Sequence, residues 1–257
     1  MQIPVIRGVI RRRLLVNYRA DPAVVRRLLP RPFLPKLHQG HAIVGICLIR
    51  LEEVRPRGLP RFLGFASENA AHRVAVEWTD EAGAARAGVY IPRRDTDSVL
   101  TTLIGGRLFP GEHHRASFSV VDDGGHIELA MQSQDDATAI RLVGDDSDTL
   151  PGSSCFASLA EASAFFEAGS LGYSATSEAT SFDGLILRTA GWRVRPLAVS
   201  EVHSSYFADP ERFPPGSVEF DHALAMRDLE HEWVAAGELA VPDAETELAP
   251  EILPQPV

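Results

Sequence analysis

Two adjacent histidines, His113 and His114, give the sequence its clearest chemical signal. They follow a Pro-Gly turn and an acid in "GGRLFPGEHHRASF" and stand at the head of a strand-like run. An imidazole titrates near pH 6.5, so one that faces a cavity can act as a general acid or base at neutral pH. Adjacent side chains of a strand point to opposite faces, so only one of the two can enter a cavity. We assign His114 to the cavity, on the face of Ala116 and Phe118; the alternative is that both histidines face solvent in a polar turn.

A series of short strands and a few helices must position these residues. The run "DPAVVRRLLP" at 21–30 begins with a capping Asp and a first-turn proline, which predicts a helix. A second helix is expected to begin at the capping acid Asp95 and to end near Gly105 and Gly106, and a third is expected over 158–169, where Ser158 and Glu161 form a capping box. β-rich runs separated by turn residues predict strands at 41–54, 72–78, 86–92, 115–121, 126–132 and 139–144, two more within 183–207, and a strand rather than a helix over 217–233.

These elements predict an α+β fold, a β-barrel or mixed antiparallel sheets with a few short helices. No linker or internal repeat divides the first part of the chain, so we expect a single domain over residues 1–241. The segment 242–257, "PDAETELAPEILPQPV", is acidic and rich in proline. That composition predicts an extended C-terminal arm.

Charge and composition exclude several classes of function. The 257 residues carry a formal net charge of -10, which argues against a nucleic-acid partner because such a protein needs a basic surface to displace counterions. No apolar run is long enough for a membrane helix, and the N-terminus lacks the order of a signal peptide, so we expect no membrane partner and a cytoplasmic location. No Gly-rich phosphate loop precedes a helix, so no nucleotide cofactor is expected.

The remaining candidate ligands and nucleophiles are sparse. Cys47 and Cys155 lie far apart in sequence and are expected to be reduced, buried thiols. His38 and His41 are spaced as in a metal motif, but no acid or cysteine accompanies them, so no metal is expected. Among 25 basic residues the one lysine is Lys36, which a Schiff-base mechanism would need. It lies between prolines and a glycine turn, so we expect it in an exposed loop.

Two stretches of the sequence resemble the acetoacetate decarboxylase superfamily. They are "YRADPAVVRRLLPRPF" at 18–33 and the strand, strand, helix and Gly-Arg order of 68–118. "FFEAGSLGYS" and "GWRVRPL" resemble more loosely its uncharacterised DUF2071/YqjF-like branch. In the decarboxylases a turn after the Gly-Arg pair presents two adjacent lysines, of which the first forms an imine with a β-keto acid. The resemblance places these lysines at His114 and Arg115, or, one residue earlier, at His113 and His114, so the imine-forming lysine is missing here.

The resemblance also implies the other parts of a site. The family's glutamate corresponds to Glu68 or Asn69, Arg107 of the Gly-Arg pair would bind substrate with His113 and Arg115, and an N-terminal arginine could be any of Arg11, Arg12, Arg13 and Arg19. His114 and Glu68 would then be the catalytic pair, without cofactor, and a homo-oligomer is expected.

We therefore expect a lyase-like or isomerase-like enzyme. It would use non-covalent acid/base chemistry on a small oxo acid or a polyketide-like enol. The alternative is a non-catalytic organic-acid binding or sensory protein on the same scaffold.

Overall fold

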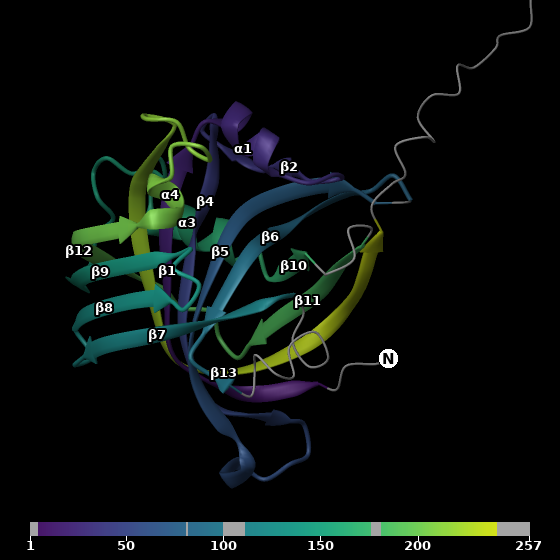
Figure 1. Cartoon of the computed structure of the whole chain (residues 1–257), viewed down its shortest axis with the longest axis vertical. Helices are drawn as coiled ribbons and strands as arrows, with labels where there is room; N and C mark the ends of the chain where they lie inside the picture. The colour runs from purple at the N-terminus through teal and green to yellow at the C-terminus, as the bar shows by residue number, and fades with distance from the viewer. Residues whose placement is uncertain (1–4, 81, 100–110, 176–180, 241–257) are drawn as a thin grey trace, which may run out of the picture.

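The computed structural model describes residues 5–80, 82–99, 111–175 and 181–240 (Figure 1). Within them, one mixed sheet of 13 strands is accompanied by a few short helices, as the sequence predicts. The strands are β1 (Ile6–Ala20), β2 (Leu34–Pro35), β3 (Leu37–His38), β4 (His41–Pro56), β5 (Phe65–Thr79), β6 (Ala85–Thr96), β7 (His113–Asp122), β8 (His126–Ser133), β9 (Ala139–Asp146), β10 (Leu171–Ala175), β11 (Ser181–Thr189), β12 (Arg195–Ser204) and β13 (Val218–Ala240). The helices are α1 (Pro22–Leu28), η1 (Arg61–Leu63), α3 (Leu159–Glu167) and α4 (Ser205–Ala208).

The helix α1 and the strand β13 follow the sequence-based predictions closely. The Asp21 carboxylate caps α1 by accepting from the backbone N–H groups of Ala23 and Val24, which have no partner inside the helix. The Ser158 hydroxyl caps α3 in the same way, through the backbone N–H of Glu161. The run 217–233 is the first part of a strand, as its alternation indicates, because it pairs along its length with β1.

The helix expected from Asp95 does not begin there. β6 continues to Thr96, and Asp95 pairs with Ala70 in the ladder to β5. Its carboxylate accepts from the Arg93 guanidinium instead of capping a helix. From residue 100 onward that expected helix lies outside the described residues, as does the arm expected over 242–257.

The sequence analysis missed β1, which is central to the sheet. β1 carries Arg11, Arg12 and Arg13 in its middle, and three consecutive charges conceal its alternation. It nevertheless pairs with β4 on one side and with β13 on the other. Arg12 can be buried there because its guanidinium binds the carboxylates of Glu68 and Asp122.

Two strands fork, and the forks create two separate interiors. The middle of β6 pairs with β10 and its end pairs with β7, both in parallel. β13 pairs first with β12 and later with β11. The strands β13, β1, β4, β5 and β6 thus form a wall between the β10–β11 arm and the β7–β8–β9–β12 arm (Figure 1).

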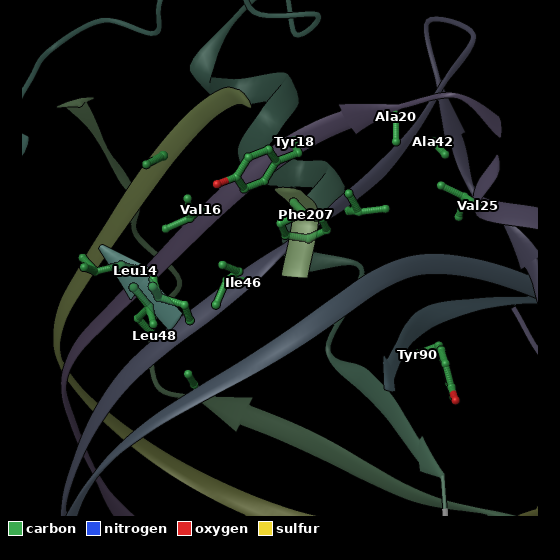
Figure 2. Close-up of a cluster of buried hydrophobic side chains, with 14 of the residues drawn as sticks. Leu14, Val16, Tyr18, Ala20, Val25, Ala42, Ile46, Leu48, Tyr90 and Phe207 are labelled. Carbon is green, nitrogen blue, oxygen red and sulfur yellow. The ribbon is translucent and has the colours of Figure 1, made fainter. Parts of the chain in front are cut away.

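The two faces of this wall bury different sets of residues. Leu14, Val16 and Tyr18 of β1 lie beside Ile46 and Leu48 of β4 in the larger apolar cluster, which Figure 2 shows. The odd-numbered neighbours on these two strands point to the other face, as the two-residue period of a strand requires. That second face carries the candidate site.

Candidate functional site

A largely apolar cavity of about 130 Å³ lies on the side of the wall closed by β10 and β11. Residues from eight strands and from the segment after α3 line it, and its mouth is partly open. The apolar lining includes Ile49, Leu51, Val89, Ile91, Leu185 and Leu187. A cavity of this kind, with a few convergent polar groups, is the usual form of a small-molecule site.

Three arginines, Arg13, Arg73 and Arg94, converge on this cavity from β1, β5 and β6. Arg73 is only 5% exposed, donates to the Asn17 side-chain oxygen, and has no hydrogen-bond partner for its Nε. Its guanidinium also lies 4.9 Å from the centre of the Phe166 ring. Burial, with a smaller contribution from the nearby Arg13 charge, lowers the pKa of Arg73 to about 10.

Arg13 and Arg94 are held by groups other than carboxylates. Arg13 donates from Nε to the Cys47 sulfur at 3.3 Å and lies over the Trp192 ring. Arg94 donates from Nε and Nη2 to the Ser174 hydroxyl oxygen, at 3.1 and 3.0 Å. Burial lowers the pKa of Arg94 to about 10 as well, which still leaves its guanidinium charged at neutral pH.

Within the described part of the chain, no carboxylate forms an ion pair with any of these three arginines. Arginines that are adjacent to them in sequence do have carboxylate partners. Arg12, next to Arg13, binds Glu68 at 2.7 Å, and Arg93, next to Arg94, binds Asp95 at 2.8 Å. Asp95 also borders the cavity, but Arg93 neutralises it. The cavity is therefore an apolar enclosure with an excess of positive charge, which favours a bound anion.

The structure places His113, and not His114, at the cavity. The two side chains point to opposite faces of β7, as expected, but the assignment of His114 to the cavity is wrong. His114 shares a face with Ala116, which is buried in the larger cluster on the other side of the wall, and its Nδ1 lies 3.3 Å from the Asp135 carboxylate. His113 contacts the Gly111 carbonyl through Nδ1 at 3.2 Å. Burial, followed by the Arg94 charge, lowers the pKa of His113 to about 3, so its imidazole is neutral at pH 7.

The same alternation separates Glu68 from Asn69 on β5. Asn69 lines the cavity, where its side-chain N–H donates to the Ser67 hydroxyl at 2.9 Å and its oxygen accepts from Thr96. Glu68 is not among the lining residues and binds Arg12 on the opposite face. Burial raises the pKa of Glu68, and the Arg12 charge opposes that shift. Glu68 therefore stands in a structural ion pair, away from the position expected of a catalytic acid.

The arginines named from the sequence are dispersed. Arg115 donates to the Asp97 carbonyl at 2.7 Å and does not line the cavity. Arg107 lies outside the described residues. Of the N-terminal candidates, Arg13 faces the cavity; Arg11 binds Glu52 and Asp228 at the surface, Arg12 binds Glu68, and Arg19 binds Glu219.

Sequence reasoning missed Arg73, Arg94 and Cys47 as site residues. The available signal was a charged residue on an otherwise apolar strand, as Arg73 is in "HRVAVEW". Its side chain either pairs with a carboxylate or faces a polar site, and only the three-dimensional structure shows which.

Lys36 is less exposed than its loop context indicates. It is half-buried, and its ammonium lies 4.6 Å from the centre of the Phe165 ring. It borders a hollow of about 30 Å³ whose wall includes Arg13 and Arg73, but it does not line the main cavity.

Two further structural features bear on the sequence-based expectations. In the described ranges, no group of three or more His, Cys, Asp or Glu side chains could hold a metal ion. No helix in the same ranges is long and apolar enough to cross a membrane.

Several solved structures share this architecture. An acetoacetate decarboxylase-like enzyme from Sphingomonas wittichii RW1 is 12% identical, with a TM-score of 0.55 and coverage of 94% of each chain. The enduracididine biosynthesis enzyme MppR complexed with pyruvate is 12% identical, with a TM-score of 0.56 over 95% of this chain and 92% of that one. Acetoacetate decarboxylase from Legionella pneumophila is 11% identical, with a TM-score of 0.56 over 91% and 87%. The chain therefore has an acetoacetate decarboxylase-like fold.

The family is given by the sequence itself. The DUF2071 family model, which describes an uncharacterised conserved protein, matches residues 9–208. The chain belongs to this family, as the resemblance of its motifs indicates. No curated protein matches the sequence.

Proposed function

We propose that the protein binds a small oxo acid in the cavity and acts on it by non-covalent acid/base chemistry, as a lyase-like or isomerase-like enzyme. The observation that carries the proposal is the convergence of Arg13, Arg73 and Arg94 on an apolar cavity without a carboxylate partner in the described residues. Two or more guanidinium groups bind a carboxylate through paired N–H donors. The apolar walls would enclose the carbon chain.

His113 takes the acid/base role that the sequence analysis gave to His114. With its pKa near 3, the imidazole is neutral before a ligand binds, and its proton lies on Nδ1, which donates to the Gly111 carbonyl. Nε2 therefore carries no proton and can accept one from an enol hydroxyl or an acidic carbon of the ligand. A bound anion adds a negative charge beside the ring, which raises the tendency of His113 to take a proton in the complex. Asn69 offers a second polar group on the same lining.

The comparison with MppR supports the choice of ligand class, because that protein's structure holds pyruvate. The geometry also supports a reaction without an imine, since no lysine lines the cavity in the described residues and the chain's one lysine, Lys36, borders a separate small hollow.

Calorimetric titration with pyruvate and acetoacetate tests the binding step. We expect saturable binding to the native protein, loss of at least about tenfold in affinity in Arg94→Gln, and no change in the matched control Arg27→Gln, whose arginine lies exposed on α1. Absence of binding to the native protein would refute the proposal.

NMR detection of product from the same acids then separates the two candidate functions. Turnover that is lost in His113→Gln supports the enzyme. Saturable binding with no product from any acid of the panel would favour the organic-acid binding or sensory protein instead.

A further inference from the structure

Cys47 lines the same cavity as the three arginines. It comes from β4, is half-buried, and lines the cavity together with Arg13, Arg73 and Arg94. Its sulfur accepts a hydrogen bond from Arg13 Nε at 3.3 Å. The other two arginines of the same lining, Arg73 and Arg94, have no carboxylate partner among the described residues, so positive charge surrounds the part of the cavity that the sulfur borders.

The second cysteine has the opposite surroundings. Cys155 is also half-buried and free, but its backbone N–H donates to the Asp221 carboxylate at 2.8 Å. Burial, followed by the Asp221 charge, raises the pKa of the Cys155 thiol to about 12. The chain therefore holds one thiol among cations and one beside an anion, and each serves as a control for the other.

We propose that Cys47 is a modification site for small carboxylates that carry an electrophilic carbon. The inference rests on the anion site of the proposed function, which would bring the carboxylate of the reagent to the arginines and its reactive carbon to the sulfur. Arg73 supplies the independent sign of a ligand, because it is 5% exposed, borders the same cavity and has an unpartnered Nε. The role is distinct from acid/base chemistry at His113.

Iodoacetate is a probe with both parts of the required chemistry. The Cys47 sulfur, as thiolate, attacks the carbon that bears iodine; the S–C bond forms, the C–I bond breaks, and iodide leaves with the bonding electron pair. The thiol proton passes to the buffer. Iodoacetamide undergoes the same substitution without a charge, so the ratio of the two rates reports the electrostatic contribution of the cavity.

The experiment measures both rates for both cysteines of the native protein, by mass spectrometry of the separated peptides. Glutathione provides the ratio for a free thiol. We expect the iodoacetate to iodoacetamide ratio at Cys47 to exceed that of glutathione by about tenfold or more, and to fall toward it at high salt. At Cys155 the ratio is expected to be at or below that of glutathione, because of Asp221.

Two variants locate the effect. Arg13→Gln removes the guanidinium that donates a hydrogen bond to the Cys47 sulfur, and we expect the iodoacetate to iodoacetamide ratio at Cys47 to fall several-fold. Arg27→Gln removes the same charge from the distant surface of α1 and should leave the ratio unchanged. A Cys47 ratio equal to that of glutathione, or a Cys47 that neither reagent modifies, would overturn the inference.

Failure of this inference can be distinguished from failure of the proposed function. If pyruvate binds in the calorimeter but Cys47 shows no preference for iodoacetate, the modification site fails and the oxo-acid function stands. If Cys47 reacts selectively but no oxo acid of the panel binds, the function fails and the modification site stands.

Discussion

Replacing Arg73 by methionine should make the protein more stable and at the same time remove anion binding. The pKa of Arg73 falls from the ordinary 12.5 to about 10, chiefly because the side chain is buried. At 1.36 kcal/mol for each pKa unit, the charged guanidinium is about 3 kcal/mol less stable in the folded protein than in water. Arg73 is 5% exposed, so solvent screening does not reduce this figure much.

The sign of this contribution is fixed by the direction of the shift. The unfolded chain holds the Arg73 proton more tightly than the folded protein does, so the charge lowers the free energy of unfolding at every pH below about 10. This destabilisation fades only as the pH rises from about 10 through 12.5. A neutral methionine of similar length removes it at pH 7.

Two lost contacts reduce the gain. Methionine cannot donate to the Asn17 side-chain oxygen, a loss of about 1 kcal/mol. It also loses the cation–π contact with the Phe166 ring, which contributes about 1 kcal/mol. The expected net gain is about 1 kcal/mol, or about 2 to 4 °C in Tm for a chain of this size.

Thermal unfolding of the native protein and of Arg73→Met, each with and without pyruvate, tests this expectation. A ligand of the folded state raises Tm, so the native protein should respond to pyruvate and the variant should not. The matched control is Arg12→Met, which removes a buried arginine that binds Glu68 and Asp122 and should cost about 3 to 5 kcal/mol. A fall in Tm for Arg73→Met, together with an unchanged response to pyruvate, would refute the reasoning.

Three further predictions follow from the geometry of the histidines and of the lysine. His113→Gln should abolish turnover or weaken binding of the acid. His114→Gln loses only a half-exposed contact with Asp135, so it should retain turnover and binding and lose no more than about 1 kcal/mol of stability. Steady-state rates and denaturant unfolding of the two variants check this. Borohydride added with the oxo acid should leave no adduct detectable by mass spectrometry, and a trapped adduct on Lys36 would show an imine mechanism instead. His72 is fully buried with neither ring nitrogen hydrogen-bonded, and burial lowers its pKa to about 3. The unfolded chain therefore takes up a proton at His72 below pH 6.5 that the folded protein does not, and the native protein should lose up to about 1.4 kcal/mol of stability for each pH unit below 6.5. His72→Phe should reduce the dependence of the unfolding free energy on pH by one proton between pH 6 and 4, and an unchanged slope would contradict the assignment.

Local signals in the sequence determined much of the secondary structure. The Asp21-Pro22 start of α1 and the Ser158 cap of α3 depend on groups within three or four residues, so they can be identified without knowledge of the fold. The strands β7, β8 and β9 are bounded by turns that the sequence shows directly. The alternation of His113 and His114 is likewise a local property of a strand.

Only the tertiary structure decided which face of each strand meets the cavity. The two-residue period separates His113 from His114 and Asn69 from Glu68, but it does not say which member faces the site. Here both faces of the wall are buried, one in the apolar cluster and one at the cavity, because β6 and β13 each fork between two partners. The forks depend on pairings between residues far apart in the chain.

The role of each arginine was also decided by the tertiary structure and not by the sequence. The sequence supplies Arg11, Arg12 and Arg13 in succession and gives no reason to prefer one. In the fold, surface carboxylates bind Arg11 and buried or half-buried carboxylates bind Arg12, which leaves Arg13 to face the cavity beside Cys47. An arginine becomes an anion-binding group because of the partners that it lacks, and long-range contacts between strands determine those partners.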